Sequence, residues 1–204
     1  MGGRAPGRST YHHGFLANAL VEAAVELARE GGPEAIVLRE AARRLGVSAS
    51  SAYRHFADHE DLIAAVKVRA QGSLTEAMKA EPVVVAEGAK AQALARLQAL
   101  GRGYVRFALA NPGLFRAAFN QTTPTAADSE SFGLLAAALD GLVTSGAMPA
   151  ARRPRAETAV WATVHGLAML LMEGQPLGKL SEAERAQEIE ETLHFVARGL
   201  VSRR

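Results

Sequence analysis

The chain contains no cysteine among its 204 residues, which excludes disulfide bonds and thiolate metal sites. It also contains no run of about 18 apolar residues, the length that a transmembrane helix needs. Its first residues, MGGRAPGRSTYHHG, lack the apolar core of a signal peptide. These absences lead us to expect a cytoplasmic protein with no membrane partner.

Aromatic residues are scarce, at 5% of the chain, although apolar residues as a whole reach 49%. The longest run of strand-forming residues is Val83–Val85, whereas alanine and leucine, which favour helices, dominate. The composition therefore predicts an all-α protein with enough apolar material for a real core.

Signatures of enzymes are missing as well. The sequence has no P-loop, no dinucleotide-binding pattern and no nucleophile elbow. His55 and His59 have a spacing that can hold zinc on one helix, but Ala57 and Asp58 interrupt the helical pattern between them. We therefore expect no catalytic residue, no metal and no cofactor.

Residues 38–62 predict two short helices joined by a tight turn and followed directly by a third helix. The first has the apolar spacing of one helical face, at Leu38, Ala41, Ala42 and Leu45. Gly46 suits the left-handed end of that helix, and Ser48 can cap the second helix. The second helix turns Ala52 and Phe56 inward. Its outer side carries short or planar hydrogen-bonding groups, as a helix in the major groove requires.

The run GVSASSAYRHFADHEDLIAAV, with its Gly-Val-Ser turn and aromatic-x-His-Phe stretch, resembles the DNA-binding domain of the tetracycline-repressor (TetR) family. The resemblance covers about residues 11–66 and implies that double-stranded operator DNA is a partner. One position departs from the family, because Val37 stands where Ser or Thr usually caps the first helix of the motif. A cap worth about 0.5–2 kcal/mol is therefore expected to be missing.

The expected DNA contacts follow from this motif and from charge. Arginines gather in it, at positions 39, 43, 44 and 54, and phosphates require such positive groups. Arg54 and Ser50 are candidates for base edges, and the resemblance places Tyr53 and His55 on phosphates. The full predicted contact set is Arg39, Ser48, Ala49, Ser50, Ser51, Tyr53, Arg54, His55 and His59.

Helix breaks and loop segments along the chain predict three regions: a flexible arm over 1–12, the helix-turn-helix domain over 13–66 and a helical regulatory domain over 67–204. Helices are expected at about 14–30, 38–45, 59–80, 89–110, 114–120, 129–144 and 154–173. Ser181 and Glu184 form a capping box for the last helix.

The last helix has an apolar seam at spacings of three and four, which resembles a heptad pattern. The seam consists of Ala186, Ile189, Leu193, Val196 and Leu200. The preceding helix is apolar nearly all round, as expected of a helix that is buried on more than one side. We therefore predict a homodimer through these two helices. The alternative is that both pack only within the monomer.

A ligand cavity is the second prediction for the regulatory domain. The segments YVRFALANPGLFRAAF and VWATVHGL resemble family members with a Trp…His-Gly regulatory domain. The candidate lining is Tyr104, Phe107, Phe119, Trp161, His165 and Met169, and the alternative is that these residues form plain core. The leading hypothesis is a homodimeric repressor that a small apolar effector releases from DNA. A protein whose C-terminal domain only dimerises is the second hypothesis, and an enzyme on a helical bundle is a distant third.

Overall fold

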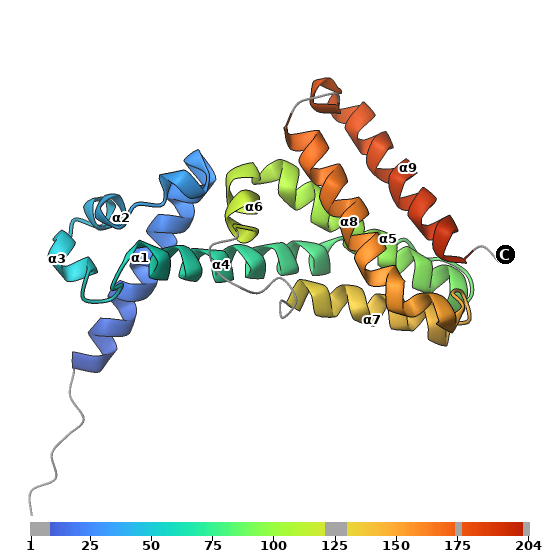
Figure 1. Ribbon diagram of the computed structural model, residues 1–204, viewed down its shortest axis with the longest axis horizontal. Helices are drawn as coiled ribbons and strands as arrows, with labels where there is room; N and C mark the ends of the chain where they lie inside the picture. The colour runs from blue at the N-terminus through green and yellow to red at the C-terminus, as the bar shows by residue number, and fades with distance from the viewer. Residues whose placement is uncertain (1–8, 121–129, 174–176, 202–204) are drawn as a thin grey trace, which may run out of the picture. The chain divides into compact units, whose positions relative to one another are not determined.

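The computed structural model describes residues 9–120, 130–173 and 177–201 (Figure 1). Within these ranges all regular structure is helical, which confirms the predicted all-α class. Contacts between residues divide the chain into two compact units. The first comprises residues 1–70 with 113–124, and the second comprises residues 71–112 with 125–204.

The first unit contains helices α1 (Ser9–Gly31), α2 (Leu38–Arg44), α3 (Ala49–Ala52) and α6 (Pro112–Ala118), with the first half of α4 (His59–Ala80). Helix α1 contacts both α2 and α3, which also contact each other. The side chains buried in this unit include Leu20, Ala24, Ile36, Ala41, Ala52, Leu62, Leu114 and Phe115. Figure 1 shows α1, α2 and α3 grouped as the three helices of a compact head.

The turn between α2 and α3 is built from backbone hydrogen bonds that glycine makes possible. Gly46 has a positive φ of 68°. Its N–H donates to the carbonyl of Arg43 at 3.1 Å, and the N–H of Val47 donates to the carbonyl of Ala42 at 3.0 Å. This is a Schellman arrangement, which satisfies the last carbonyls of α2. The predicted glycine turn is therefore confirmed.

Helix caps set the beginnings of α3 and α4. The Ser48 hydroxyl accepts from the N–H of Ser51 at 3.2 Å, which confirms the predicted cap. At α4, the Asp58 carboxylate accepts from the N–H of Asp61, and the Asp61 carboxylate accepts from the N–H of Ala57. This reciprocal cap was not expected from the sequence, which indicated only a break at residues 57–58. Together the two caps hold the short α3 segment between fixed ends.

Helix α2 begins without a side-chain cap, as predicted, because the N-cap residue is Val37. Val37 has an extended conformation, with φ −127° and ψ 120°, that a capping threonine also adopts. Replacing Val37 with Thr keeps the side-chain shape and adds an acceptor, so we expect a gain in unfolding free energy of about 0.5–1.5 kcal/mol. Urea titration of Val37→Thr against Val37→Ala tests this, because both remove valine but only threonine can cap. Equal stabilities of the two variants would contradict it.

The predicted domain boundaries differ from the two units at helix α6. The sequence placed this helix in the regulatory domain, but it groups with the first unit. The reason is close packing. A Cβ on Gly113 would collide with the carbonyl of Ala28, so only glycine lets α6 meet the end of α1 this closely. Phe115 is fully buried, and the Lys67 ammonium donates to the carbonyl of Asn120 at 2.9 Å.

The first unit also differs from the prediction at its ends. Helix α1 begins at Ser9, inside the segment expected to be an arm, and residues 1–8 of that arm lie outside the described residues. The two units divide after Ala70 rather than after residue 66.

The second unit contains α5 (Ala89–Ala110), α7 (Glu130–Thr144), α8 (Arg153–Met172) and α9 (Glu182–Val201), with the second half of α4. Helix α5 contacts α7, α8 and α9, and α8 contacts α9 (Figure 1). One buried cluster consists of Leu97, Leu135, Leu139, Leu142, Met148, Ala156, Val160 and Leu200. The capping box at α9 is confirmed, with the Ser181 N–H donating to Glu184 at 2.8 Å and the Glu184 N–H donating back at 3.3 Å.

Candidate DNA-binding surface and effector cavity

Every residue of the predicted DNA-contact set is exposed or half-buried. The set begins with Arg39 on α2, continues through α3 and the turn after it, and ends with His59 at the start of α4. Ala52 and Phe56, which were expected to face inward, are buried. The structure therefore gives α3 the polar outer face that the sequence predicted.

Hydroxyl groups organise this outer face. Ser48 Oγ lies 3.0 Å from Ser50 Oγ, and Ser48 also donates to Ser51 Oγ at 3.2 Å. Arg54 donates through Nη2 to Ser51 Oγ at 2.8 Å. The partner of the Arg54 guanidinium is thus a neutral hydroxyl, so its charge is not cancelled by this contact.

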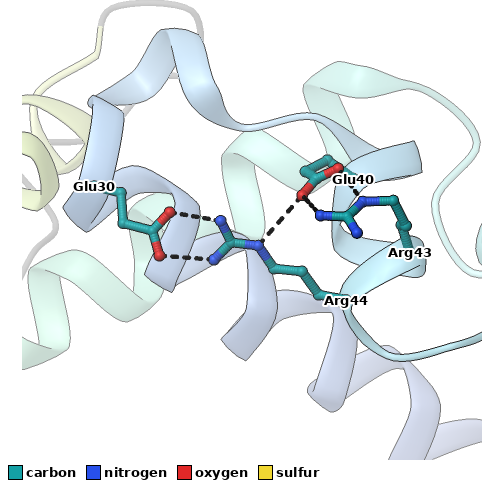
Figure 2. A network of polar contacts seen from close by, with 4 residues as sticks. All are labelled: Glu30, Glu40, Arg43 and Arg44. Atoms are coloured by element: carbon teal, nitrogen blue, oxygen red, sulfur yellow. Dashed lines mark hydrogen bonds and ion pairs between the residues drawn. The ribbon is translucent and has the colours of Figure 1, made fainter.

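Two other arginines of the motif are paired internally (Figure 2). Arg44 donates to both carboxylate oxygens of Glu30 on α1, at 2.9 and 2.5 Å, and its Nε lies 3.5 Å from Glu40. Arg43 makes a second bidentate pair with Glu40, at 2.8 and 2.7 Å. Within the described ranges neither Arg39 nor Arg54 makes an ion pair, so these two guanidiniums are the ones left unneutralised on this surface.

The pairing shifts the acid titration of both carboxyl groups. The hydrogen bond from Arg43 lowers the pKa of Glu40 to about 2, from an ordinary value of 4.5. The hydrogen bond from Arg44 lowers the pKa of Glu30. The bidentate contact of Arg44 with Glu30 links α2 to α1 and so holds the helix that precedes α3, whereas the Arg43–Glu40 pair lies within α2.

A pH dependence follows from the Glu40 pair. Because the folded-state pKa of Glu40 is depressed, its contribution to stability is present above about pH 4.5 and disappears as pH falls toward 2. We expect Glu40→Gln to flatten the loss of stability across this window, measured by urea unfolding at low salt. Arg43→Gln should flatten it similarly, and the double variant should add little. A wild-type slope in Glu40→Gln would contradict this assignment.

The second unit holds a cavity of about 40 Å³ between α4, α5, α7, α8 and α9. Of the predicted lining, Tyr104 and Trp161 are present. His165 does not line the cavity but contacts both, with Nδ1 2.8 Å from the Tyr104 hydroxyl and its ring stacked on Trp161 at 5.3 Å. The structure therefore brings these three residues together, two of them in the lining of the cavity.

Three predicted lining residues lie elsewhere. Phe107 is buried on α5 but does not reach the cavity, and Met169 is half-buried on α8. Phe119 belongs to the first unit, where its ring packs against Phe115 at 4.9 Å. Helical spacing, residue type and the resemblance suggested all three, but whether a helical residue meets a cavity depends on which neighbouring helix it faces.

The lining also contains residues that the sequence analysis missed. They include Met78, Gln98, Gly101, Ser131, Phe132 and Val164. Leu97, Gly101 and Tyr104 recur at helical spacing on α5, which was a usable signal. Gly101 matters because a Cβ there would lie 2.5 Å from Leu193 Cδ2, so the absent side chain leaves room beside the cavity.

The Tyr104–His165 pair beside the cavity is uncharged near pH 7. Burial raises the pKa of the Tyr104 hydroxyl and lowers the pKa of His165, so both groups are neutral near pH 7. The Tyr104 hydroxyl and His165 Nδ1 lie 2.8 Å apart, at hydrogen-bonding distance. The arrangement fixes an aromatic wall without placing a charge in it.

The predicted dimer seam on α9 faces the interior of its own unit and not a partner subunit. Ile189, Leu193 and Leu200 are buried inside their own unit, and Val196 is half-buried at the cavity. Only Ala186 of the seam is exposed. The reason is that α5 and α8 of the same chain supply the apolar surface that covers this face.

The opposite faces of α8 and α9 are the ones left open. Phe195 of α9 is 71% exposed, and Leu170 of α8 is 47% exposed. On α8, Ala159 and Ala162 are exposed as well. A Cβ on Gly166 would meet no other atom within 4 Å. This outer face of α8 and α9 is therefore accessible to another molecule.

The part of the chain that the structure describes lacks two further kinds of feature, a metal site and a membrane-spanning helix. No group of three His, Asp and Glu side chains there is arranged to hold a metal ion. None of the helices there combines the length and apolar character needed to cross a membrane.

A short polar helix behind a Schellman turn, braced by two other helices, defines a helix-turn-helix DNA-binding protein. Comparison with protein families agrees. The model described as bacterial regulatory proteins of the tetR family matches residues 20–66, and the one described as tetracyclin repressor-like, C-terminal domain, matches residues 97–196. The chain belongs to the TetR family of transcriptional regulators.

Individual relatives extend over nearly the whole chain. It is 24% identical to the uncharacterized HTH-type transcriptional regulator YobS of Bacillus subtilis (strain 168), over 93% of this chain and 92% of that protein. A solved protein of unknown function from Rhodococcus sp. RHA1 is 26% identical, with a TM-score of 0.71 over 94% of this chain and 98% of that one. A TetR variant from Acinetobacter baumannii AYE, solved with minocycline, has a TM-score of 0.63 at 19% identity, over 91% and 98% of the two chains.

Proposed function

We propose that this regulator is a cytoplasmic repressor that binds a palindromic operator as a homodimer and is released by a small apolar molecule. The observation that carries the DNA-binding part is the outer face of α3. There Arg54 is exposed, donates a hydrogen bond to the Ser51 hydroxyl, and lies in sequence close to the exposed Ser50 and Tyr53. Such groups can reach base edges and phosphates in a major groove.

Dimerisation is supported by the outer face of α8 and α9. An exposed phenylalanine and leucine beside small residues suit close helix packing between two copies. A two-fold dimer also presents two α3 helices to the two halves of a palindrome. We therefore place the proposed interface on the outward faces of α8 and α9, where Leu170 and Phe195 are exposed, and not on the buried seam.

Effector release is supported by the cavity and by the family. The related TetR variant was solved in complex with minocycline, a small molecule. A cavity of about 40 Å³ is far smaller than a typical ligand pocket of roughly 300–1,000 Å³. The liganded state must therefore be wider, and a ligand that binds it in preference shifts the population toward that state. A differential affinity of about 1–3 kcal/mol is typical of such coupling.

The DNA-binding proposal predicts that Arg54→Ala weakens operator binding by about 1–3 kcal/mol, roughly 5–150-fold. The operator is obtained by selection from a random-sequence library with the wild-type protein, and affinity is measured by gel shift at several salt concentrations. A phosphate contact lowers the salt slope by about 1, whereas a base contact relaxes sequence preference. Arg155→Ala, an exposed arginine of the second unit, serves as the control. Unchanged affinity and specificity in Arg54→Ala would remove Arg54 from the contact set.

The dimerisation-only alternative differs in one respect. It predicts that no small molecule changes Trp161 fluorescence or releases operator DNA. The cavity beside Trp161 favours the sensing hypothesis, since a chain that only dimerises has no need for space there.

A further inference from the structure

The residues that line the cavity of the second unit indicate which kind of effector it would bind, if the protein senses a small molecule as proposed above. Among its lining residues there is no aspartate, glutamate, lysine or arginine, and all of these residues lie in the described part of the chain. Apolar groups make up most of the wall. The only polar side chains besides the indole of Trp161 are Gln98, Tyr104 and Ser131.

These polar groups differ in how far they are already engaged. The Tyr104 hydroxyl already hydrogen-bonds to His165 at 2.8 Å. Ser131 is buried and has polar contacts of its own. The Gln98 amide is half-buried on α5 and makes no side-chain hydrogen bond to any other described residue. It is therefore the group at the wall that has both a donor and an acceptor to offer.

We infer that the effector is an uncharged, mainly apolar molecule with one hydrogen-bonding group, such as a hydroxyl, carbonyl or amide, that pairs with Gln98. An ionised ligand would leave water without finding a counter-charge in the lining, which costs several kcal/mol or more. A pure hydrocarbon would leave the amide of Gln98 unsatisfied once water is displaced. A neutral ligand with one polar group avoids both penalties.

Four probes of one size test this: toluene, benzyl alcohol, benzoate and benzylammonium. Each is titrated into the full chain while the fluorescence of Trp161, the single tryptophan, is followed. We expect benzyl alcohol to bind about 2–10-fold more tightly than toluene, the worth of one hydrogen bond. Both ions should bind at least about 100-fold more weakly than benzyl alcohol.

Two variants, Gln98→Leu and Gly101→Ala, test which residues determine the binding of the probes. Gln98→Leu keeps the bulk and removes the amide, so the preference for benzyl alcohol over toluene should fall to about one while toluene binding is retained. Gly101→Ala places a Cβ 2.5 Å from Leu193 Cδ2 and pushes Leu193 toward the cavity, so all probes should weaken together. Urea unfolding establishes that both variants are folded.

The outcomes separate this inference from the proposed function. An ion that binds as tightly as benzyl alcohol and releases operator DNA would overturn the inference and leave sensing intact. A wild-type alcohol preference in Gln98→Leu would overturn the role of Gln98. No fluorescence change with any probe to the limit of its solubility, with operator DNA still bound, would overturn both.

Discussion

Phe195→Asp is expected to turn the proposed dimer into a folded monomer and to weaken operator binding by about 10²–10⁴-fold. The substitution removes the most exposed aromatic ring of α9 and places a charge on each copy at the proposed interface. Without the dimer, the second half-site is no longer bound at a high effective concentration, so the gain from bivalent binding is lost. Stability of the protomer should change little, because the side chain is 71% exposed within it.

Sedimentation at micromolar concentration and gel shifts with the selected operator measure the two parts of this result. Ala183→Asp is the matched control, since it adds the same charge at an exposed position in the first turns of the same helix. Near a helix N-terminus an aspartate is tolerated or favourable. A Phe195→Asp protein that remains dimeric and binds the operator normally would place the interface elsewhere.

The positions of the helices could be predicted from the sequence because their ends carry local chemistry. The predicted spans 59–80 and 89–110 agree with α4 and α5 as observed. The cap at Ser48, the glycine turn at Gly46 and the capping box at Ser181 all act within a few residues. Such signals are visible in one sequence because they need no tertiary partner.

The features that could not be predicted depend on contacts between residues that are distant in the sequence. Periodicity showed that α9 has an apolar face, but it cannot say whether that face meets the same chain or another. The assignment of α6 to the first unit rests on the contact of Gly113 with α1, across more than eighty residues. The neutralisation of Arg44 rests on Glu30, which precedes it by 14 residues.

The charge of the motif depends on which of its arginines are paired with carboxylates, and the sequence alone does not show this pairing. The sequence places four arginines in the motif, at positions 39, 43, 44 and 54, and so predicts a positive surface for phosphates. The structure pairs Arg43 and Arg44 with carboxylates and leaves Arg39 and Arg54 without ion pairs among the described residues. The positive charge available to DNA therefore comes mainly from Arg39 and Arg54, and not from all four arginines of the motif.

Leu193→Asp should unfold the second unit rather than separate two subunits, with a loss of at least about 4 kcal/mol in unfolding free energy. Leu193 is only 4% exposed, packs at Gly101 of α5 and lines the cavity beside Val164. The substitution removes buried apolar surface and leaves a carboxylate among apolar neighbours without a counter-charge.

The measurement is urea unfolding followed by circular dichroism, at a protein concentration where the wild type is dimeric. Leu193→Met, which conserves volume, should cost less than about 1.5 kcal/mol and controls for the mere loss of the branched side chain. The comparison with Phe195→Asp is decisive, because the two residues lie two positions apart on opposite sides of α9. If Leu193 faced a partner, Leu193→Asp would yield a stable monomer like that of Phe195→Asp. A well-folded monomeric Leu193→Asp protein would therefore restore the original seam as the interface and contradict the burial of this face within one chain.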